Sequence, residues 1–133
     1  MAVTSRAETF DLQASASRWE FHDGPEFPGA AGAIRWDAER GRAAPGCLVL
    51  EHSFEGGGNY VQASAPVPPG TNAKVARVWL KKPAGHRITF RVVDSAGQTF
   101  QKGVSYTSPD WQHVEVDLGR WGASFGGPGD NQL

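Results

Sequence analysis

Apolar and polar residues alternate over many short stretches of this chain, and glycine and proline separate one stretch from the next. Along residues 88–93, for example, Thr89 and Arg91 alternate with the apolar side chains of Phe90 and Val92. A period of two places neighbouring side chains on opposite faces of a β-strand. No stretch carries the apolar stripe with helical spacing that marks an amphipathic helix. The pattern therefore predicts an all-β protein.

The pattern divides the chain into a series of short predicted strands. Segments such as "EGGGN", "PVPPGTN" and "DSAGQ" lie between them, and the 17 glycines and 9 prolines of the chain suit such turns. Short strands at this spacing are typical of an antiparallel two-sheet β-sandwich, or jelly roll. The 133 residues fit one domain spanning 1–133, with 1–7 and about 122–133 as loop or tail. The predicted strands are 8–13, 17–22, 31–36, 47–54, 59–65, 75–81, 87–93, 98–106 and 111–118.

Alternation also separates a predicted core from the outward-facing positions. In the hairpin "ITFRVVDSAGQTFQ", the polar side chains of Arg91, Gln98 and Gln101 are expected on the face opposite the apolar one. The predicted core residues are Leu48, Leu50, Val61, Ala63, Val78, Leu80, Ile88, Phe90, Val92, Phe100, Val114, Val116 and Leu118.

The C-terminal segment "RWGASFGGPGDNQL" is rich in glycine and shows no further strand pattern. A closed sandwich usually pairs its first strand with one near its end. The sequence therefore leaves two expectations open: residues 121–133 form a terminal loop, or the sandwich lacks its final strand, through a fragment, a split product or a strand supplied by another chain. An unpaired sheet edge would be a site of self-association or of pairing with a partner.

Charge and composition exclude several classes of function. The net charge is −1 and the cationic residues form no cluster, so the electrostatic footprint of a nucleic-acid-binding protein is absent. No apolar run is long enough to span a membrane, and the N-terminal residues show no signal peptide. Cys47 is the single cysteine, which precludes an internal disulfide and indicates a small core residue.

Aromatic residues are the first candidates for binding chemistry, because a flat ring matches the C–H patches of a sugar. Trp79 is expected to point away from the core, since its neighbours in sequence fill the apolar register, and Arg77 and Lys81 flank it. It is either a sugar-stacking platform or a side chain packed under a loop. Trp121 and Phe125, in the glycine-rich tail, are expected to be rim contacts.

The acidic residues support metal binding or catalysis only weakly when taken by themselves. Calcium requires several oxygen ligands, and a loop such as "EFPGAAG" presents carbonyl oxygens, but each carboxylate alone suits a solvated surface. With 14 Asp and Glu some acidic pair is inevitable, so a glycosidase is not indicated by their number. The motifs of serine hydrolases, zinc proteases and phosphate-binding loops are absent.

Several segments occur in an order that points to a known family. They are "EFPGAAG", "CLVLEHSFEGGGNYVQA", "ARVWLKK", "ITFRVVDSAGQTFQ" and "DWQHVEVDLGRWG". Together they resemble the jelly-roll carbohydrate-binding modules of the galactose-binding-like superfamily, which accompany bacterial polysaccharide-degrading enzymes. The resemblance covers about residues 8–131 and departs from the family at the C-terminus, where a last strand is expected.

The resemblance implies a noncatalytic two-sheet sandwich with a sugar ligand on its concave sheet or at its loop edge, and a structural calcium ion near the first strand and early loops. By position, the implied sugar-binding residues are Tyr60, Gln62, Trp79, Arg91 and Gln101, and the implied calcium ligands are Glu8, Glu26, Asp37 and Asp117.

The leading functional hypothesis is a polysaccharide-binding module that targets a covalently attached glycoside hydrolase to its substrate. Such a module would act outside the cell as part of a larger secreted protein, with no nucleic-acid or membrane partner. One alternative is a structural or docking β-sandwich that binds no sugar. The other is a small glycoside hydrolase or lyase.

Overall fold

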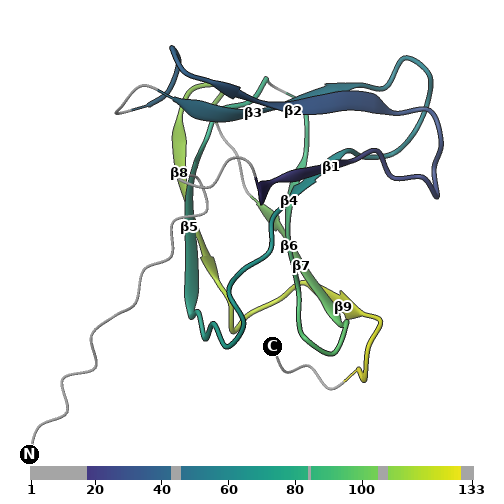
Figure 1. Ribbon diagram of the computed structural model, residues 1–133, viewed down its shortest axis with the longest axis vertical. Helices are drawn as coiled ribbons and strands as arrows, with labels where there is room; N and C mark the ends of the chain where they lie inside the picture. Colours follow the sequence, from purple (N-terminus) through teal and green to yellow (C-terminus); the bar gives the residue numbers. More distant parts are fainter. Residues whose placement is uncertain (1–17, 43–45, 84, 105–107, 130–133) are drawn as a thin grey trace, which may run out of the picture. The chain divides into compact units, whose positions relative to one another are not determined.

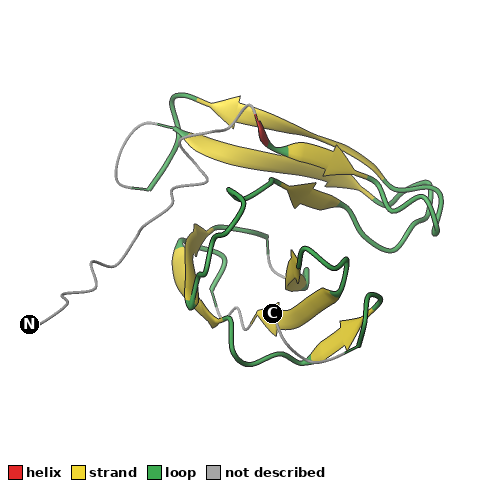
Figure 2. Ribbon diagram, turned by 60° about the horizontal axis from the view of Figure 1, so that its bottom comes forward, coloured by secondary structure: helices red, strands yellow, loops and turns green. Residues whose placement is uncertain are grey.

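The computed structural model describes residues 18–42, 46–83, 85–104 and 108–129. Within them lie nine β-strands and no α-helix, and every strand pair is antiparallel (Figure 1). The all-β, antiparallel class predicted from the alternation is therefore confirmed (Figure 2). None of the described residues belongs to a helix with the length and apolarity needed to cross a membrane. The strand predicted at 8–13 lies outside the described residues.

The chain falls into two compact units, residues 1–70 (unit 1) and residues 71–133 (unit 2). Sequence reasoning grouped all of these residues in one domain. Each unit has its own strand pairs.

Unit 1 contains two antiparallel strand pairs. Strands β2 (Ala31–Asp37) and β3 (Cys47–Ser53) pair over their whole length and form a long ribbon (Figure 1). Strands β1 (Glu20–His22) and β4 (Gln62–Ser64) form a second, shorter pair. The glycine-rich and proline-rich segments predicted as turns connect these strands.

One face of the β2–β3 ribbon carries its large apolar side chains, and the other combines charged residues with smaller apolar ones such as Val49. Trp36 pairs with Leu48 and Ile34 pairs with Leu50, so these four side chains share a face. Leu50 was predicted to be a core residue, yet 36% of it is exposed, and Trp36 is 44% exposed. A ribbon of two strands is too narrow to bury its apolar face by itself, which explains this difference.

Two loops of unit 1 meet backbone to backbone. A Cβ atom at Gly29 would lie 2.1 Å from the carbonyl oxygen of Gly56, and Gly29 has a φ of 121°. Both the left-handed φ and the close approach require glycine at this position. The "EFPGAAG" and "EGGGN" segments are therefore held together by contacts that side chains would prevent.

Unit 2 contains a two-stranded and a three-stranded sheet. Strands β5 (Val75–Leu80) and β8 (Gln112–Asp117) form the first. Strand β7 (Thr99–Val104) lies between β6 (Ile88–Val93) and β9 (Ala123–Phe125) in the second. The hairpin β6–β7 is the one that "ITFRVVDSAGQTFQ" predicts.

The core of unit 2 receives side chains from both of its sheets. Val114, Val116 and Leu118 are buried, and half-buried residues of β5, β6 and β7 pack against them. The core residues predicted on these strands are therefore largely correct, because alternation fixes the inward face of each strand. The half-buried hydrophobic residues are Ala76, Val78, Leu80, Phe90, Val92, Val104 and Trp121.

Trp121 belongs to this core, and its predicted role as a rim contact is wrong. Its ring stacks on Phe90 with 6.5 Å between centroids and lies 5.6 Å from the Phe100 ring. Its Nε1 atom donates a hydrogen bond of 2.9 Å to the carbonyl oxygen of Leu118. Burial of the indole with its N–H satisfied is the favourable arrangement for tryptophan.

The glycine-rich C-terminal segment also contains a strand. Residues 123–125 were expected to be loop or tail, but they form β9 and pair with β7. The amide of Gly122 donates to the carbonyl oxygen of Gln101 at 3.1 Å, which extends the contact. Main-chain hydrogen bonds to β7 form this strand. Its short, glycine-flanked sequence shows no alternation of apolar and polar residues, and therefore the strand was not predicted.

Candidate functional site

The outer face of the β6–β7–β9 sheet is the best-defined candidate site in unit 2. Phe90, Val92 and Phe100 point into the core, so the alternate side chains of these strands point outward. Cross-strand pairing places them in rows, with Arg91 opposite Gln101 and Val93 opposite Thr99. We call this surface the Arg91 face and define it by Arg91, Val93, Thr99, Gln101, Ala123 and Phe125.

A hydrogen bond and a ring contact position the guanidinium group of Arg91. Its Nη2 atom donates to the Oε1 atom of Gln101 at 3.0 Å. Its guanidinium carbon lies 5.6 Å from the centroid of the Phe125 ring, within the range of a cation–π interaction. Phe125 is 48% exposed although it belongs to a paired strand. A flat ring, a planar cation and an amide are thus presented together.

The surface around these three groups is open and flat. A Cβ atom at Gly103, which pairs with Thr89 in the same sheet, would meet nothing within 4 Å. Ala123 stands beside Gln101 and adds only a methyl group. Small side chains beside a ring leave room for a ligand to lie along the sheet.

Gln98 does not belong to this face, although sequence reasoning placed it there with Arg91 and Gln101. It is fully buried, on the same side of β7 as Phe100. Its Oε1 atom accepts a hydrogen bond of 2.9 Å from the amide of Gly129. Gln98 therefore fixes the segment after β9. The period of two places Gln98 on the side of Phe100, so the prediction that grouped it with Gln101 departed from the alternation.

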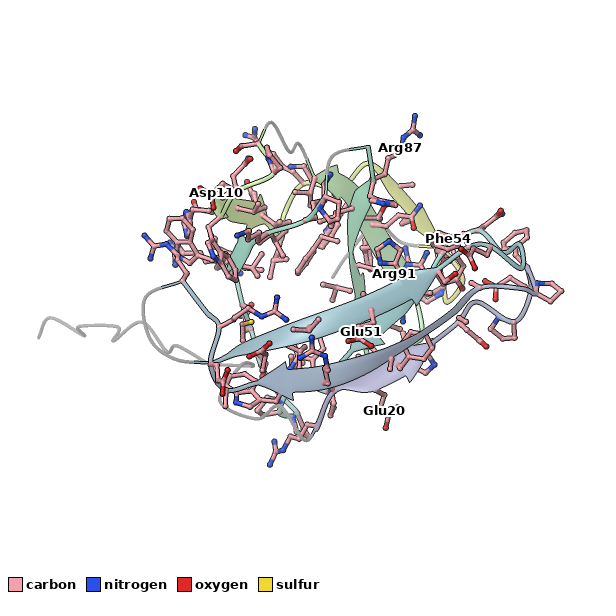
Figure 3. All side chains as sticks on the ribbon, turned by 90° about the horizontal axis from the view of Figure 1, so that it is seen from above. Glu20, Glu51, Phe54, Arg87, Arg91 and Asp110 are labelled. Carbon is pink, nitrogen blue, oxygen red and sulfur yellow. The ribbon has the colours of Figure 1, made fainter. Side chains whose placement is uncertain are left out.

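Trp79 lies on the other sheet of unit 2. It points away from the core, as the sequence predicts, and is 40% exposed. Its ring lies 4.9 Å from that of His113, the residue paired with it on β8. Asp110 lies just before β8, the strand that pairs with the strand of Trp79. Figure 3 shows Asp110 and Arg91 on different parts of unit 2.

The charges beside Trp79 are paired with opposite charges. The Nε atom of Arg77 donates to the carboxylate of Glu115 at 3.0 Å, and the Lys81 Nζ atom lies 4.0 Å from the Asp110 carboxylate. These exposed pairs make the outer face of the β5–β8 sheet electrically balanced. The positive charge expected around Trp79 is therefore largely neutralised.

Tyr60 and Gln62, the other two implied sugar-binding residues, belong to unit 1. The Tyr60 hydroxyl donates a hydrogen bond to the Glu26 carboxylate, and its ring packs where a Cβ atom at Gly24 would be, at 3.0 Å. Gln62 pairs with His22 at the end of β4. The structure thus brings Arg91 and Gln101 together, and places Trp79 on a second sheet of unit 2.

The implied calcium ligands are engaged by groups of the chain itself. Glu8 lies outside the described residues, and Glu26 accepts the hydrogen bond from Tyr60. Asp117 accepts from the amide of Gly119 at 2.8 Å and lies 3.6 Å from Arg120. These contacts stabilise loops, and they use the oxygen atoms that a metal ion would need.

Asp37 has the densest set of contacts among these carboxylates. It accepts a side-chain hydrogen bond of 2.8 Å from Arg40, one of 3.2 Å from Arg35, and two from the amides of Glu39 and Arg40. These donors, the Arg40 side chain foremost, hold the pKa of Asp37 well below its ordinary value. Glu51 and Asp37 in turn raise the pKa of Arg35. Figure 3 shows Glu51 on the β2–β3 ribbon.

In the described part of the chain, no three His, Cys, Asp or Glu side chains gather as a metal site would require. Arginine, tyrosine and backbone donors bind the three described carboxylates, Glu26, Asp37 and Asp117. Calcium binding stays a prediction of the resemblance. It is tested by comparing thermal unfolding with calcium and with a chelator.

Phe125 is the site residue that sequence reasoning did not assign to sugar binding. It was expected only as a rim contact, because the glycines around it hide the strand that carries it. The local signal for a binding role was an aromatic residue at the end of the segment "ASF", among glycines. Comparison of the chain with family models, curated proteins and solved structures found no match.

Proposed function

We propose that this chain is a noncatalytic polysaccharide-binding module and that the Arg91 face binds the sugar. One observation carries the proposal: the exposed ring of Phe125, the guanidinium group of Arg91 and the amide of Gln101 stand together on an open sheet face. A pyranose ring offers C–H groups to an aromatic face and hydroxyl groups to planar hydrogen-bonding side chains. The three residues supply both kinds of contact.

The affinity of such a face is modest. Sugar hydroxyls exchange hydrogen bonds with water for hydrogen bonds with the protein, which leaves a small net gain for each bond. A dissociation constant in the micromolar to millimolar range, about −4 to −8 kcal/mol, is the expected result. Weak binding suffices for targeting, because a covalently attached hydrolase then remains at high effective concentration near its substrate.

The jelly-roll topology and secretion as part of a larger enzyme belong to the same proposal and rest on the family resemblance. The two sheets of unit 2 share one core, which is compatible with a β-sandwich. The alternative, in which Tyr60, Gln62 and Trp79 bind the sugar, rests on that resemblance alone. The Arg91 face has the additional support of its own contacts.

The direct test is retention of the protein in gels that contain single soluble polysaccharides, followed by calorimetric titration with any that retain it. Phe125→Ala should reduce the retention strongly. Phe27→Ala is the matched control, because Phe27 is 46% exposed in unit 1 and Phe125 is 48% exposed. Retention by no polysaccharide would overturn the proposal in favour of a docking module, and release of reducing sugar would favour an enzyme.

A further inference from the structure

The two sheets of unit 2 differ in the distribution of charge. The outer face of the β5–β8 sheet carries the ion pair of Arg77 and Glu115. Strands β6, β7 and β9, in contrast, contain Arg91 and Lys102 and no Asp or Glu. The Arg91 face therefore presents a cation on strands that carry no carboxylate.

The carboxylate nearest in sequence has a structural role. Asp94 follows β6 directly, and its Oδ1 atom accepts hydrogen bonds of 2.9 Å from the amides of Ala96 and Gln98. These bonds fix the turn between β6 and β7 in the manner of an Asx turn. Asp94 thus acts on the backbone of the hairpin, and its hydrogen bonds hold the strand ends on which Arg91 and Gln101 depend.

The polar groups of the face are arranged as hydrogen-bond donors. Because the Oε1 atom of Gln101 accepts from Arg91, the amide group of Gln101 meets a ligand through its N–H donors. The guanidinium group is a planar set of donors, and the Phe125 ring supports it. An ionised carboxylate has acceptors only, and its planar shape matches a guanidinium group in a bidentate pair.

We infer that the Arg91 face selects glycans that carry a carboxylate on the sugar ring, that is, uronic acid units. Phe125 contacts the ring C–H groups, and Arg91 and Gln101 donate to the carboxylate oxygens. The inference rests on the proposed function and narrows it to one class of glycan. A sulfate ester presents similar acceptor oxygens but has tetrahedral geometry, so the test includes it separately.

The test uses pairs of polysaccharides that share a backbone and differ only in the exocyclic carbon, which is a carboxylate in one and a hydroxymethyl group in the other. Suitable pairs are mannuronan with β-1,4-mannan oligomers, and oxidised with unmodified cellulose oligomers. The acidic member should bind about fivefold more tightly, which is the size of effect expected for one exposed charge pair. The preference should decrease at high ionic strength, because salt screens exposed charges.

Two variants assign the preference to the face. Arg91→Gln removes the cation, and Gln101→Glu places a carboxylate where the ligand's carboxylate would lie. Both should abolish the preference for the acidic member, because each variant weakens binding of the acidic member more than binding of the neutral member. Arg77→Gln is the matched control, because it removes a cation from the other sheet of the same unit. Thermal unfolding of each variant establishes that it is folded.

Each outcome decides the inference. Loss of the preference in both variants and its persistence in Arg77→Gln would support it. Equal binding of the acidic and neutral members would overturn the inference and leave the proposed function intact. Binding of neither member of any pair would also overturn the inference, and the absence of retention by any polysaccharide would overturn the proposed function itself. Binding of dextran sulfate or polyphosphate, with no binding of the carboxylated glycans, would overturn the assignment to uronic acids.

Discussion

Arg91 and Gln101 occupy directly paired positions of β6 and β7, and their side chains are joined by a 3.0 Å hydrogen bond from Nη2 to Oε1. The pairing brings together two residues that are ten positions apart in the chain. The register of the hairpin fixes this relationship, since a shift by one residue would turn one of the two side chains into the core. The candidate site thus depends on the backbone of the hairpin as well as on its side chains.

Phe125→Ala and Trp79→Ala distinguish the two outer faces of unit 2. We expect Phe125→Ala to weaken glycan binding about tenfold, which corresponds to about 1.4 kcal/mol, because it removes the stacking ring and the support of Arg91. Trp79→Ala should change affinity less than about twofold, since Trp79 lies on the other sheet. Calorimetric titration of both variants measures this difference. The reverse order would place the sugar on the β5–β8 sheet.

Phe100→Ala should destabilise unit 2 strongly. The Phe100 side chain is 1% exposed and packs against Trp121, so its removal leaves a cavity in a close-packed core. The expected loss is about 3–5 kcal/mol in the free energy of unfolding, measured by urea denaturation. The exposed Phe125 provides the comparison within the same sheet, and Phe125→Ala should cost less than about 1 kcal/mol. Similar losses for both would mean that the sheet is not packed as described.

Gly29→Ala should destabilise unit 1 more than Gly70→Ala does. Both glycines have a left-handed φ, which costs another residue about 1–2 kcal/mol. Only at Gly29 would the added Cβ atom also collide with backbone, at 2.1 Å from the Gly56 carbonyl oxygen. At Gly70, nothing lies within 4 Å of that position. Comparison of the two melting temperatures isolates the cost of separating the two loops, and equal melting temperatures would argue against the contact.

Asp37 should make the stability of unit 1 dependent on pH at the acidic end. Its pKa is lowered in the folded chain, so its contribution is complete above the ordinary aspartate value, about 3.9, and decreases as the pH falls through the lowered pKa. Asp37→Asn removes the charge that Arg40 and Arg35 contact. The wild-type protein should therefore be more stable than the variant at neutral pH, and the difference should shrink in acid.

Urea denaturation at a series of pH values from neutral to strongly acidic measures that difference. Glu20→Gln is the control, because the Glu20 side chain is exposed in the same unit. A difference between wild type and Asp37→Asn that stays constant over the whole range would show that the carboxylate charge does not contribute.

Alternation predicted much of the fold correctly. The residues of β5, β6 and β8 that were assigned to the core, such as Val78, Phe90 and Val116, do pack together. Alternation within one strand separates its inward from its outward residues. The outward positions of Trp79 and Arg91 were therefore also predicted correctly. The same rule could not say which outward faces belong to one sheet, and it was the family resemblance that grouped Trp79 with Arg91 and Gln101.

The errors fall where long-range contacts override the local pattern. Gln98 is buried because the amide of Gly129, 31 residues away in the chain, bonds to its side chain. Trp121 is in the core because the β6–β7 hairpin provides the rings of Phe90 and Phe100. Glycine-rich neighbours gave no alternation from which the position of Trp121 could be predicted, whereas the period of two already places Gln98 on the side of Phe100.

The sequence by itself determined the all-β class and the hairpin of β6 and β7. It also determined the inward face of each strand of this hairpin, because a period of two acts within a few residues. Only the tertiary structure decided that β9 pairs with β7 and that Phe125 thereby reaches Arg91. The physical reason is that sheet pairing is made by main-chain hydrogen bonds between distant segments, and these bonds leave little trace in the side chains of a short, glycine-flanked strand.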